Sequence, residues 1–219
     1  EEAMADGSRV LLFAACQPGP NGRGISSPLP LAFVLLRNPV RENAKETFAY
    51  FHAQGVTVKV ISGDNPVTVS AAAREAGIEG ADRYVDASTL ETYEDIEAAC
   101  EEYNVFGRVK PNQKKLLIQA LQSNKHTVAM TGDGVNDVLA LKEADCSVAM
   151  ASGSDVAAQI SDLVLMNSDF SSMPSVVAEG RRVITNIERA ASLYLVKNIF
   201  SFILAFITLF ATLPYPFTP

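Results

Sequence analysis

The sequence predicts an α/β fold, in which a parallel sheet is covered by helices on both faces, followed by one long helix. Short apolar runs bounded by turn residues alternate with amphipathic stretches along the 219 residues, and 48% of the residues are apolar, enough to fill one sizeable core. From residue 174 to about residue 213 the only helix breaker is Gly180. A helix of about 40 residues would be about 60 Å long, which exceeds both a domain and a bilayer. We therefore expect a stalk that leaves the domain and enters a membrane.

Turn residues at both ends delimit the predicted strands. In chain order these strands are residues 9–14, 31–36, 56–61, 127–130, 147–150 and 163–165. Residues 17–30 are rich in Gly, Pro and Ser, and we expect them to form a hairpin tip or a loop.

Amphipathic spacing and capping residues indicate the predicted helices. In chain order these are residues 42–52, 65–76, 95–103, 112–123, 135–144 and 154–161. Asn65 and Pro66 open the second helix, because proline is tolerated in a first helical turn. Gly55 and Gly77 follow the first two helices, where glycine commonly ends a helix.

Charge and cysteine content exclude some classes of protein. The net charge of −7 argues against a nucleic-acid partner, which would require a basic face. Cys16, Cys100 and Cys146 are far apart and odd in number, so no disulfide framework or metal spacing is visible, which fits a reducing cytosolic compartment. The chain starts with Glu1 and without a signal peptide, so we expect it to be a fragment of a longer protein.

The strongest candidate site follows the predicted strand 127–130. Residues 131–137 read Thr-Gly-Asp-Gly-Val-Asn-Asp, and ligands bind beyond the carboxyl ends of strands in open α/β sheets. The glycines allow a phosphate to approach the backbone closely. The Asp133 and Asp137 carboxylates, with the Asn136 amide between them, suit Mg²⁺, which prefers one or two carboxylates together with water and phosphate. The alternative is a turn whose solvated acids cap a helix.

Two further segments favour a phosphate site. Ser62, Gly63 and Asp64 end the predicted strand 56–61, where the hydroxyl and an amide could donate to a phosphoryl oxygen, although Ser-Gly-Asp is also an ordinary turn. Pro111 begins a helix whose N-terminus favours anions, and Lys114 is close enough to that end to reach a phosphate. A solvated surface lysine is the alternative for Lys114.

These three segments, in this order, resemble the motifs of P-type ATPases of the haloacid dehalogenase superfamily, and the resemblance covers essentially the whole chain. It implies a Rossmann-like parallel sheet of the haloacid dehalogenase type, with Mg²⁺ and ATP as cofactors. It implies metal ligation by Asp133 and Asp137, and nucleotide contacts by Arg9 and Arg108. The implied catalytic set is Ser62, Gly63, Asp64, Lys114, Asn136 and Asp137.

The nucleophile of that family is the aspartate of an Asp-Lys-Thr-Gly-Thr string, and no such string occurs in this sequence. The resemblance places it upstream, on a strand N-terminal to this chain. We therefore expect the full-length protein to be an ATP-driven cation pump with an aspartyl-phosphate intermediate, and the isolated chain to be inactive. Two alternatives remain open: a catalytically incomplete module that binds Mg²⁺ or nucleotide, and a membrane-anchored phosphatase of the same superfamily. The phosphatase would need an Asp-x-Asp near its N-terminus, and none is present.

The implied division of the chain has four parts. Residues 1–30 end the nucleotide-binding domain and return the chain, 31–170 form the phosphorylation domain, 171–192 the stalk and 193–213 the transmembrane helix. Residues 38–41, Asn-Pro-Val-Arg, resemble the hinge, where the family usually has Asp in place of Asn38.

Residues 193–213 are apolar except for Lys197, Asn198 and a few hydroxyls, and about 20 such residues cross a bilayer. A buried core helix is the alternative. Arginines precede this stretch and no charge follows it, so the positive-inside tendency places the globular part in the cytoplasm. A Leu-Pro-Tyr-Pro sequence at 213–216 is expected to end the helix.

The Glu-Gly-Arg-Arg sequence at 179–182 resembles the stalk into the fifth transmembrane helix of the family. Counting from it, Asn198 matches an ion-ligand asparagine of calcium and sodium pumps, and Ser201 stands where those pumps have a glutamate. Lys197 matches a lysine of some potassium-linked and proton pumps, and it either acts as an internal cation or snorkels to the interface. The expected partners are ATP, a transported cation with calcium favoured, the lipid bilayer and the rest of the polypeptide, in a plasma membrane of bacterial type.

Overall fold

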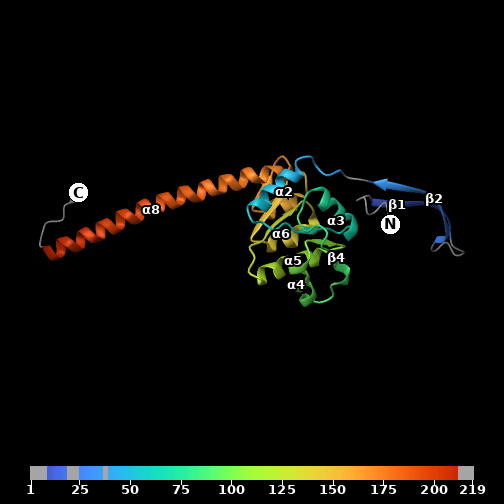
Figure 1. The fold of residues 1–219 in the computed structure, drawn as a ribbon, viewed down its shortest axis with the longest axis horizontal. Coiled ribbons are helices and arrows are strands. Elements are labelled where there is room, and N and C mark those ends of the chain that lie inside the picture. Colours follow the sequence, from blue (N-terminus) through green and yellow to red (C-terminus); the bar gives the residue numbers. More distant parts are fainter. Residues whose placement is uncertain (1–8, 19–24, 37–38, 212–219) are drawn as a thin grey trace. The chain divides into compact units, whose positions relative to one another are not determined.

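The computed structural model describes residues 9–18, 25–36 and 39–211 (Figure 1). It divides into two compact units, Glu1–Ser171 and Ser172–Pro219. Some sequence predictions fall outside the described residues: Glu1, the middle of the 17–30 segment, Asn38 of the hinge and the helix end at 213–216. The side chain of Arg9 also lies outside them, although its backbone belongs to a strand.

The first element of the larger unit is an antiparallel hairpin. Strand β1 (Arg9–Pro18) pairs with β2 (Ile25–Leu36). The predicted strand 9–14 lies within β1, and the predicted strand 31–36 lies within β2. Both strands extend into the segment 17–30 that was predicted as a hairpin tip or a loop: the hairpin is present, but residues 17–18 and 25–30 belong to its strands. The register shifts where Ala14 pairs with Pro30, and a bulge of this kind is where a strand accommodates proline.

Six short strands form two parallel sheets. In the first, β3 (Val60–Ile61), β4 (Tyr84–Asp86) and β5 (Val105–Gly107) are ordered β3-β5-β4. In the second, β6 (Ala129–Gly132), β7 (Cys146–Met150) and β8 (Leu163–Leu165) are ordered β6-β7-β8. The predicted α/β class with parallel strands is confirmed, although the strands form two sheets instead of one.

The sequence missed β4 and β5 because three residues are too few to show a periodicity. Conversely, residues 56–61 were predicted as one strand, yet only Val60 and Ile61 belong to β3. The partner strand β5 is itself three residues long, so it can pair with no more of the segment.

The helices of this unit pack around the strands (Figure 1). They are α2 (Ala44–Ala53), α3 (Pro66–Glu75), α4 (Tyr93–Glu102), α5 (Pro111–Ser123), α6 (Val138–Glu143) and α7 (Asp155–Ile160). The Asn65 side chain accepts a hydrogen bond from the N–H of Val67 at 2.9 Å and so caps α3, as the sequence suggested. The segment predicted as a helix from residue 135 begins instead as the 3-10 turn Val135–Asp137.

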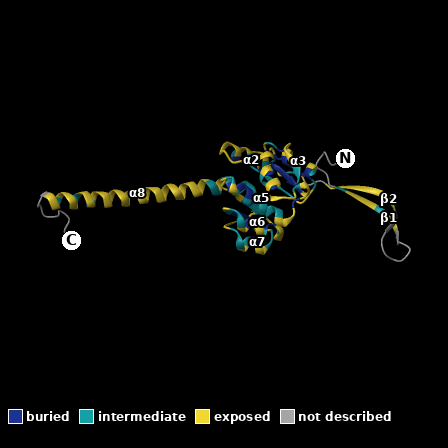
Figure 2. Ribbon diagram, turned by 90° about the horizontal axis from the view of Figure 1, so that it is seen from below, coloured by how far each residue is buried: buried dark blue, intermediate teal, exposed yellow. Residues whose placement is uncertain are grey.

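The core shows that helices cover both faces of the first sheet. Val105 and Phe106 are neighbours on β5 and point to opposite faces. Val105 packs with α2 and α3 residues such as Phe48 and Val69, and Phe106 packs with α4 and α5 residues such as Leu117. Figure 2 shows the buried residues, in dark blue, among the strands and helices of this unit.

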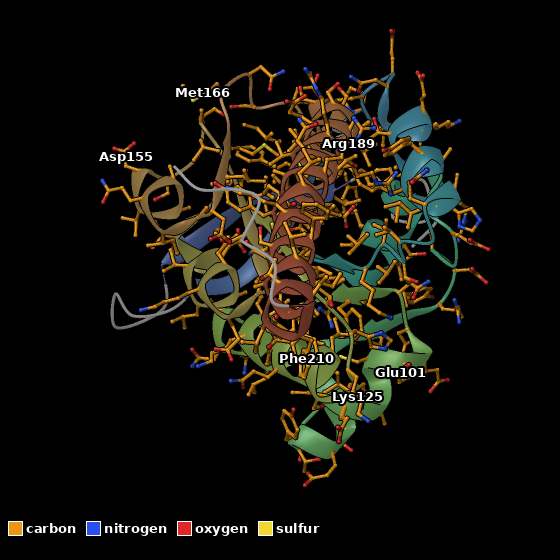
Figure 3. The ribbon with its side chains drawn as sticks, turned by 90° about the vertical axis from the view of Figure 1, so that its left-hand side faces the viewer. Glu101, Lys125, Asp155, Met166, Arg189 and Phe210 are labelled. Atoms are coloured by element: carbon orange, nitrogen blue, oxygen red, sulfur yellow. The ribbon has the colours of Figure 1, made fainter. Side chains whose placement is uncertain are left out.

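Polar contacts at the ends of α4 and α5 join these two helices. Glu101 accepts hydrogen bonds from Asn124 at 2.9 Å and pairs with His126 at 3.2 Å. Figure 3 labels Glu101 beside Lys125, whose φ of 66° turns the chain out of α5. The contacts hold the C-terminal end of α5, the helix that carries Lys114 near its other end.

The described part of the second unit is formed by α8 (Met173–Ala211), a helix of 39 residues. It is the one helix among the described residues that is long and apolar enough to cross a membrane, by length and composition. Its apolar side chains are largely exposed (Figure 2). At spacings of four residues, the ring of Phe206 stacks on that of Phe202 and contacts that of Phe210 in a tilted arrangement.

Candidate functional site

The loop after β6 seats one of its aspartates in the protein interior. A Cβ atom at Gly132 would lie 2.7 Å from the Cβ of Asp137, so only glycine allows Asp137 to pack there. The 3-10 turn Val135–Asp137 brings Asp137 back over the end of the strand, and the residue is only 7% exposed. A carboxylate this buried requires partners of its own.

Lys114 and the backbone of the loop supply these partners. The Nζ atom of Lys114 lies 2.6 Å from Oδ1 of Asp137, and the two side chains are 13% and 10% exposed. The other oxygen, Oδ2, accepts a hydrogen bond from the N–H of Gly134 at 3.2 Å. Both carboxylate oxygens are therefore engaged, and the ion pair ties the first turn of α5 to the loop after β6.

Asp133, in the same loop, is exposed, and its carboxylate makes no hydrogen bond or ion pair with any described residue. Its backbone is fixed, because its carbonyl accepts a hydrogen bond from the N–H of Ser154 at 2.7 Å. A Cβ atom at Gly153 would lie 2.3 Å from that carbonyl oxygen. The turn before α7 thus holds the backbone of Asp133 while its side chain stays available. Asn136 is likewise exposed.

The loop after β3 is held from the other side. The N–H of Arg108 donates to the carbonyl of Asp64 at 2.8 Å, and the N–H of Val109 donates to the carbonyl of Ser62 at 3.0 Å. The Ser62 hydroxyl oxygen accepts from the N–H of Asp64 at 3.2 Å, which leaves the hydroxyl proton to donate to a ligand. A Cβ at Gly63 would meet nothing closer than 3.8 Å, so sterics do not demand glycine there.

Arg108 itself is paired with an acid from a neighbouring strand. Its Nη1 atom lies 2.7 Å from Oδ2 of Asp86, at the end of β4. A hydrogen bond from the Ser88 hydroxyl is the largest cause that lowers the pKa of Asp86, and the positive charge of Arg108 contributes. Asp86 is therefore a carboxylate at neutral pH.

The segment from Arg108 to Lys114 joins the two loops. At its start its backbone N–H groups donate to the carbonyls of Ser62 and Asp64, and at its end Lys114 pairs with Asp137. This one segment therefore contacts the Ser62 loop and Asp137, whereas Asp133 and Asn136 belong to the same loop as Asp137 and, among the described residues, make no hydrogen bond to the segment. Lys197, Asn198 and Ser201 lie on α8, in the second unit, where Lys197 and Asn198 are exposed.

The donor set is suited to a metal bound together with a phosphate. Within the part of the chain that the structure describes, no group of three or more His, Cys, Asp or Glu residues could hold a metal. Asp133 offers a free carboxylate, whereas Asp137 is engaged by Lys114 and Gly134. Mg²⁺ commonly takes one or two carboxylates and fills its other positions with water and phosphate. The residues present fit that ion.

Sequence reasoning missed the contacts made by Gly153, Ser154 and Asp86. Gly153 and Ser154 follow β7, and Asp86 ends β4, so all three lie at carboxyl ends of parallel strands. That position is a signal for a functional role, but β4 was not predicted, and residue 154 was predicted only as the start of a helix.

Known proteins are similar to this chain in sequence. The family profile of the haloacid dehalogenase-like hydrolases matches residues 20–145, more than half of the chain. The chain is 49% identical over 215 residues to a protein of Streptococcus pneumoniae named probable cation-transporting ATPase exp7, covering 97% of this chain and 28% of that protein. It is 49% identical over 207 residues to calcium-transporting ATPase CtpE of Mycobacterium tuberculosis, covering 94% and 26%. The chain spans between a quarter and a third of the length of these relatives.

Two solved structures have a similar fold. The crystal structure of a zinc-transporting PIB-type ATPase in its E2.Pi state aligns with a TM-score of 0.67, covering 98% of this chain and 29% of that chain at 24% identity. The catalytic domain of the CPx-ATPase CopB-B aligns with a TM-score of 0.50, covering 76% and 57% at 23% identity. At these identities the likeness shows a common fold.

Proposed function

The chain belongs to the haloacid dehalogenase-like hydrolases, and on this premise we propose that it is the phosphate-stabilising part of a P-type cation-pumping ATPase. The observation that carries the proposal is the segment from Arg108 to Lys114, which binds the Ser62 loop at one end and Asp137 at the other. This segment gathers the donors that a phosphoryl group in transfer requires. The relatives named as cation-transporting ATPases support the same function.

In this proposal the residues of the chain divide the work of phosphoryl transfer, which is mostly positioning and charge stabilisation. Ser62 donates its hydroxyl proton, and Gly63 its backbone N–H, to a phosphoryl oxygen. Lys114 brings a positive charge to the same group, held by Asp137. Mg²⁺ held by Asp133 would neutralise further negative charge on the phosphate. Asn136, exposed in the same loop, faces the phosphate end of the site, and Asp64 completes the Ser62 loop.

The nucleophilic aspartate is proposed to come from a strand outside this sequence. Among the described strands, β3 and β6 are edges of their sheets, each with one neighbour. Strand β3 is followed by the loop that contains Ser62, and β6 by the loop that contains Asp133. Residues from both sheets belong to the same hydrophobic core cluster. A parallel strand between β3 and β6 would pair with both and would present its own carboxyl end between the two loops.

Helix α8 is proposed to carry the link to transport. Residues 193–213 would cross a plasma membrane, with the globular part on the cytoplasmic side. Asn198 and Ser201 are proposed to line the ion path, and Lys197 is either an internal cation there or reaches back to the interface. The relatives named as calcium-transporting ATPases favour calcium as the cation. ATP would contact Arg108 and, in the hairpin, Arg9.

One observation favours a second function. The sequence has no Asp-Lys-Thr-Gly-Thr string, so a natural protein limited to these residues would be a Mg²⁺-binding or nucleotide-binding module without turnover. ATP hydrolysis by the full-length polypeptide separates the two functions, since the module would show none.

The test is cation-stimulated ATP hydrolysis by the full-length polypeptide in membrane vesicles with Mg²⁺, scanned over mono- and divalent cations. We expect Ca²⁺ to stimulate turnover. Asp133→Asn should lower it on the order of 100-fold, the scale of removing one stabilising group of a phosphoryl site. Asp82→Asn removes an exposed carboxylate elsewhere in the same unit and should leave turnover unchanged. Absence of stimulation by every cation, or an active Asp133→Asn variant, would contradict the proposal.

A further inference from the structure

Arg108 has a backbone conformation that is unusual for its residue type. Its φ of 52° lies in the left-handed region, which residues other than glycine, asparagine and aspartate seldom occupy. The residue before it is constrained as well, because a Cβ atom at Gly107 would lie 2.4 Å from the backbone of Pro66. In this conformation the N–H of Arg108 donates to the carbonyl of Asp64 at 2.8 Å. The unusual backbone of Arg108 is therefore fixed by a contact with the Ser62 loop.

Asp86 fixes the side chain of Arg108. It lies opposite Gly107 in the register of β4 and β5, one residue before Arg108. Its Oδ2 atom lies 2.7 Å from Nη1 of Arg108, and its Oδ1 atom accepts hydrogen bonds from Ser88, at 3.0 Å from the N–H and 2.6 Å from the hydroxyl. The carboxylate cannot rotate away from Arg108 without losing Ser88. Its side chain is 24% exposed, whereas that of Arg108 is 54% exposed.

The 3-10 turn Ala87–Thr89 after Asp86 is itself braced against α5. The side-chain amide of Gln113 donates to the carbonyl of Ala87 at 2.8 Å, while its oxygen accepts from the N–H of Lys110 at 3.1 Å. Gln113 precedes Lys114 in the chain. Asp86 is therefore carried by a turn that is anchored to the same helix start as the phosphate-site lysine.

We propose that Asp86 is a positioning residue that orients Arg108 toward the phosphates of the bound nucleotide. The inference rests on the proposed function, in which Arg108 contacts ATP. Asp86 occupies one nitrogen of the guanidinium, and the other N–H groups have no partner among the described residues and lie on an exposed side chain. Planar N–H groups held in this way match the oxygens of a phosphate. Without Asp86 the arginine would have to give up its rotamer freedom on binding.

The test measures ATP affinity of the full-length polypeptide by displacement of a fluorescent ATP analogue, together with kcat and the melting temperature. Asp86→Asn should raise the Kd for ATP about five-fold while kcat changes less than about two-fold, since the residue acts on binding and not on the transferred group. Arg108→Gly removes the side chain and retains the left-handed backbone, because glycine adopts it freely. In that background, Asp86→Asn should have no further effect on the Kd.

Asp95→Asn is the matched control. Asp95 also accepts a hydrogen bond at the start of a short structural element, from the N–H of Thr92 at 3.0 Å, but it pairs with no arginine among the described residues. It should lower the melting temperature about as much as Asp86→Asn and leave the Kd unchanged. Three results would overturn the inference: equal effects of Asp86→Asn with and without Arg108, an unchanged Kd, or a lower Kd, which would mean that Asp86 competes with the nucleotide. If the wild-type protein binds no ATP, the proposed function itself fails.

Discussion

At the residue scale, the ion pair of Lys114 and Asp137 is the feature on which the site depends. Both side chains are nearly buried and 2.6 Å apart. A buried pair stabilises little relative to an apolar pair, but removal of one partner leaves an uncompensated charge in the interior. Asp137 packs so closely on Gly132 that a Cβ atom there would lie 2.7 Å from its own. A need for positive charge at this point explains the pair better than stability does.

Lys114→Met should therefore destabilise the protein by about 3 kcal/mol. The methionine side chain fills the space of the lysine hydrocarbon chain but carries no charge, so the buried Asp137 carboxylate is left without its cation. Lys115→Met is the control: Lys115 pairs with Glu143 at 3.2 Å, with side chains 40% and 29% exposed, so its loss should cost less than about 1 kcal/mol. Chemical denaturation of the wild type and both variants measures these losses in the free energy of unfolding. Equal losses would mean that the Lys114 pair is not buried in the native protein.

Gly153→Ala tests how the backbone of Asp133 is held. A methyl group there would meet the Asp133 carbonyl at 2.3 Å, and we expect a loss of about 1–3 kcal/mol, the usual cost of overpacking. A higher Mg²⁺ concentration should also be needed for half-maximal ATP hydrolysis. Gly180→Ala is the control, since nothing lies within 4 Å of its Cβ position and alanine favours a helix. A Gly153→Ala variant with wild-type stability and Mg²⁺ dependence would rule out this contact.

At the scale of elements, hydrogen bonds at strand ends connect the second sheet to its loops. Asp162, just before β8, accepts hydrogen bonds from the N–H and the hydroxyl of Ser147 on β7, both at 2.8 Å. Both hydrogen bonds lower the pKa of Asp162, and the bond from the N–H has the larger effect. A carboxylate whose pKa is lower in the folded state stabilises the protein above its unfolded pKa of about 3.9, and this contribution is lost as the pH falls through the folded value.

We expect Asp162→Asn to lower the urea midpoint at about pH 6 and to flatten its fall below about pH 4, so that wild type and variant approach each other as the pH falls through the lowered pKa of Asp162. Urea unfolding across that range measures the effect. Asp82→Asn, which changes a carboxylate without hydrogen-bond partners among the described residues, should keep the wild-type pH dependence. A difference between wild type and Asp162→Asn that stays constant with pH would contradict the role assigned to the charge.

The elements differ in how far the sequence predicted them. Helices such as α3 and α5 could be predicted because a cap and several turns of periodicity lie within the segment itself. The strands β4 and β5 could not, since they are defined by pairing and not by a local pattern. The site shows the same division. The loops of Ser62 and Asp133 were visible as motifs, whereas Asp86 and Gly153 act through contacts between segments distant in the chain.

At the scale of the whole molecule, the chain joins a hydrolase fold to a helix of membrane-spanning length. The first unit carries the proposed phosphate site, and α8 carries the apolar stretch. The relatives that share both parts are named as cation-transporting ATPases and are three to four times longer. This combination separates the proposed pump from a soluble hydrolase of the same family.

A charge within α8 tests the membrane assignment. Ile203→Arg places an arginine at the centre of the 193–213 stretch, where insertion costs about 2.5–3.5 kcal/mol, so less of the expressed 219-residue chain should resist alkaline extraction from membranes. Val183→Arg, outside that stretch, should extract as the wild type does. Similar behaviour of both variants would count against the span.

The most direct test of the central claim is the acid-stable phosphoenzyme formed from γ-labelled ATP and Mg²⁺. We predict that the full-length polypeptide becomes labelled on an aspartate, with a bond that hydroxylamine cleaves, and that the isolated 219-residue chain does not. Labelling of the isolated chain, or phosphate release by it above an Asp133→Asn blank, would contradict the claim that these residues supply phosphate stabilisation and not the nucleophile.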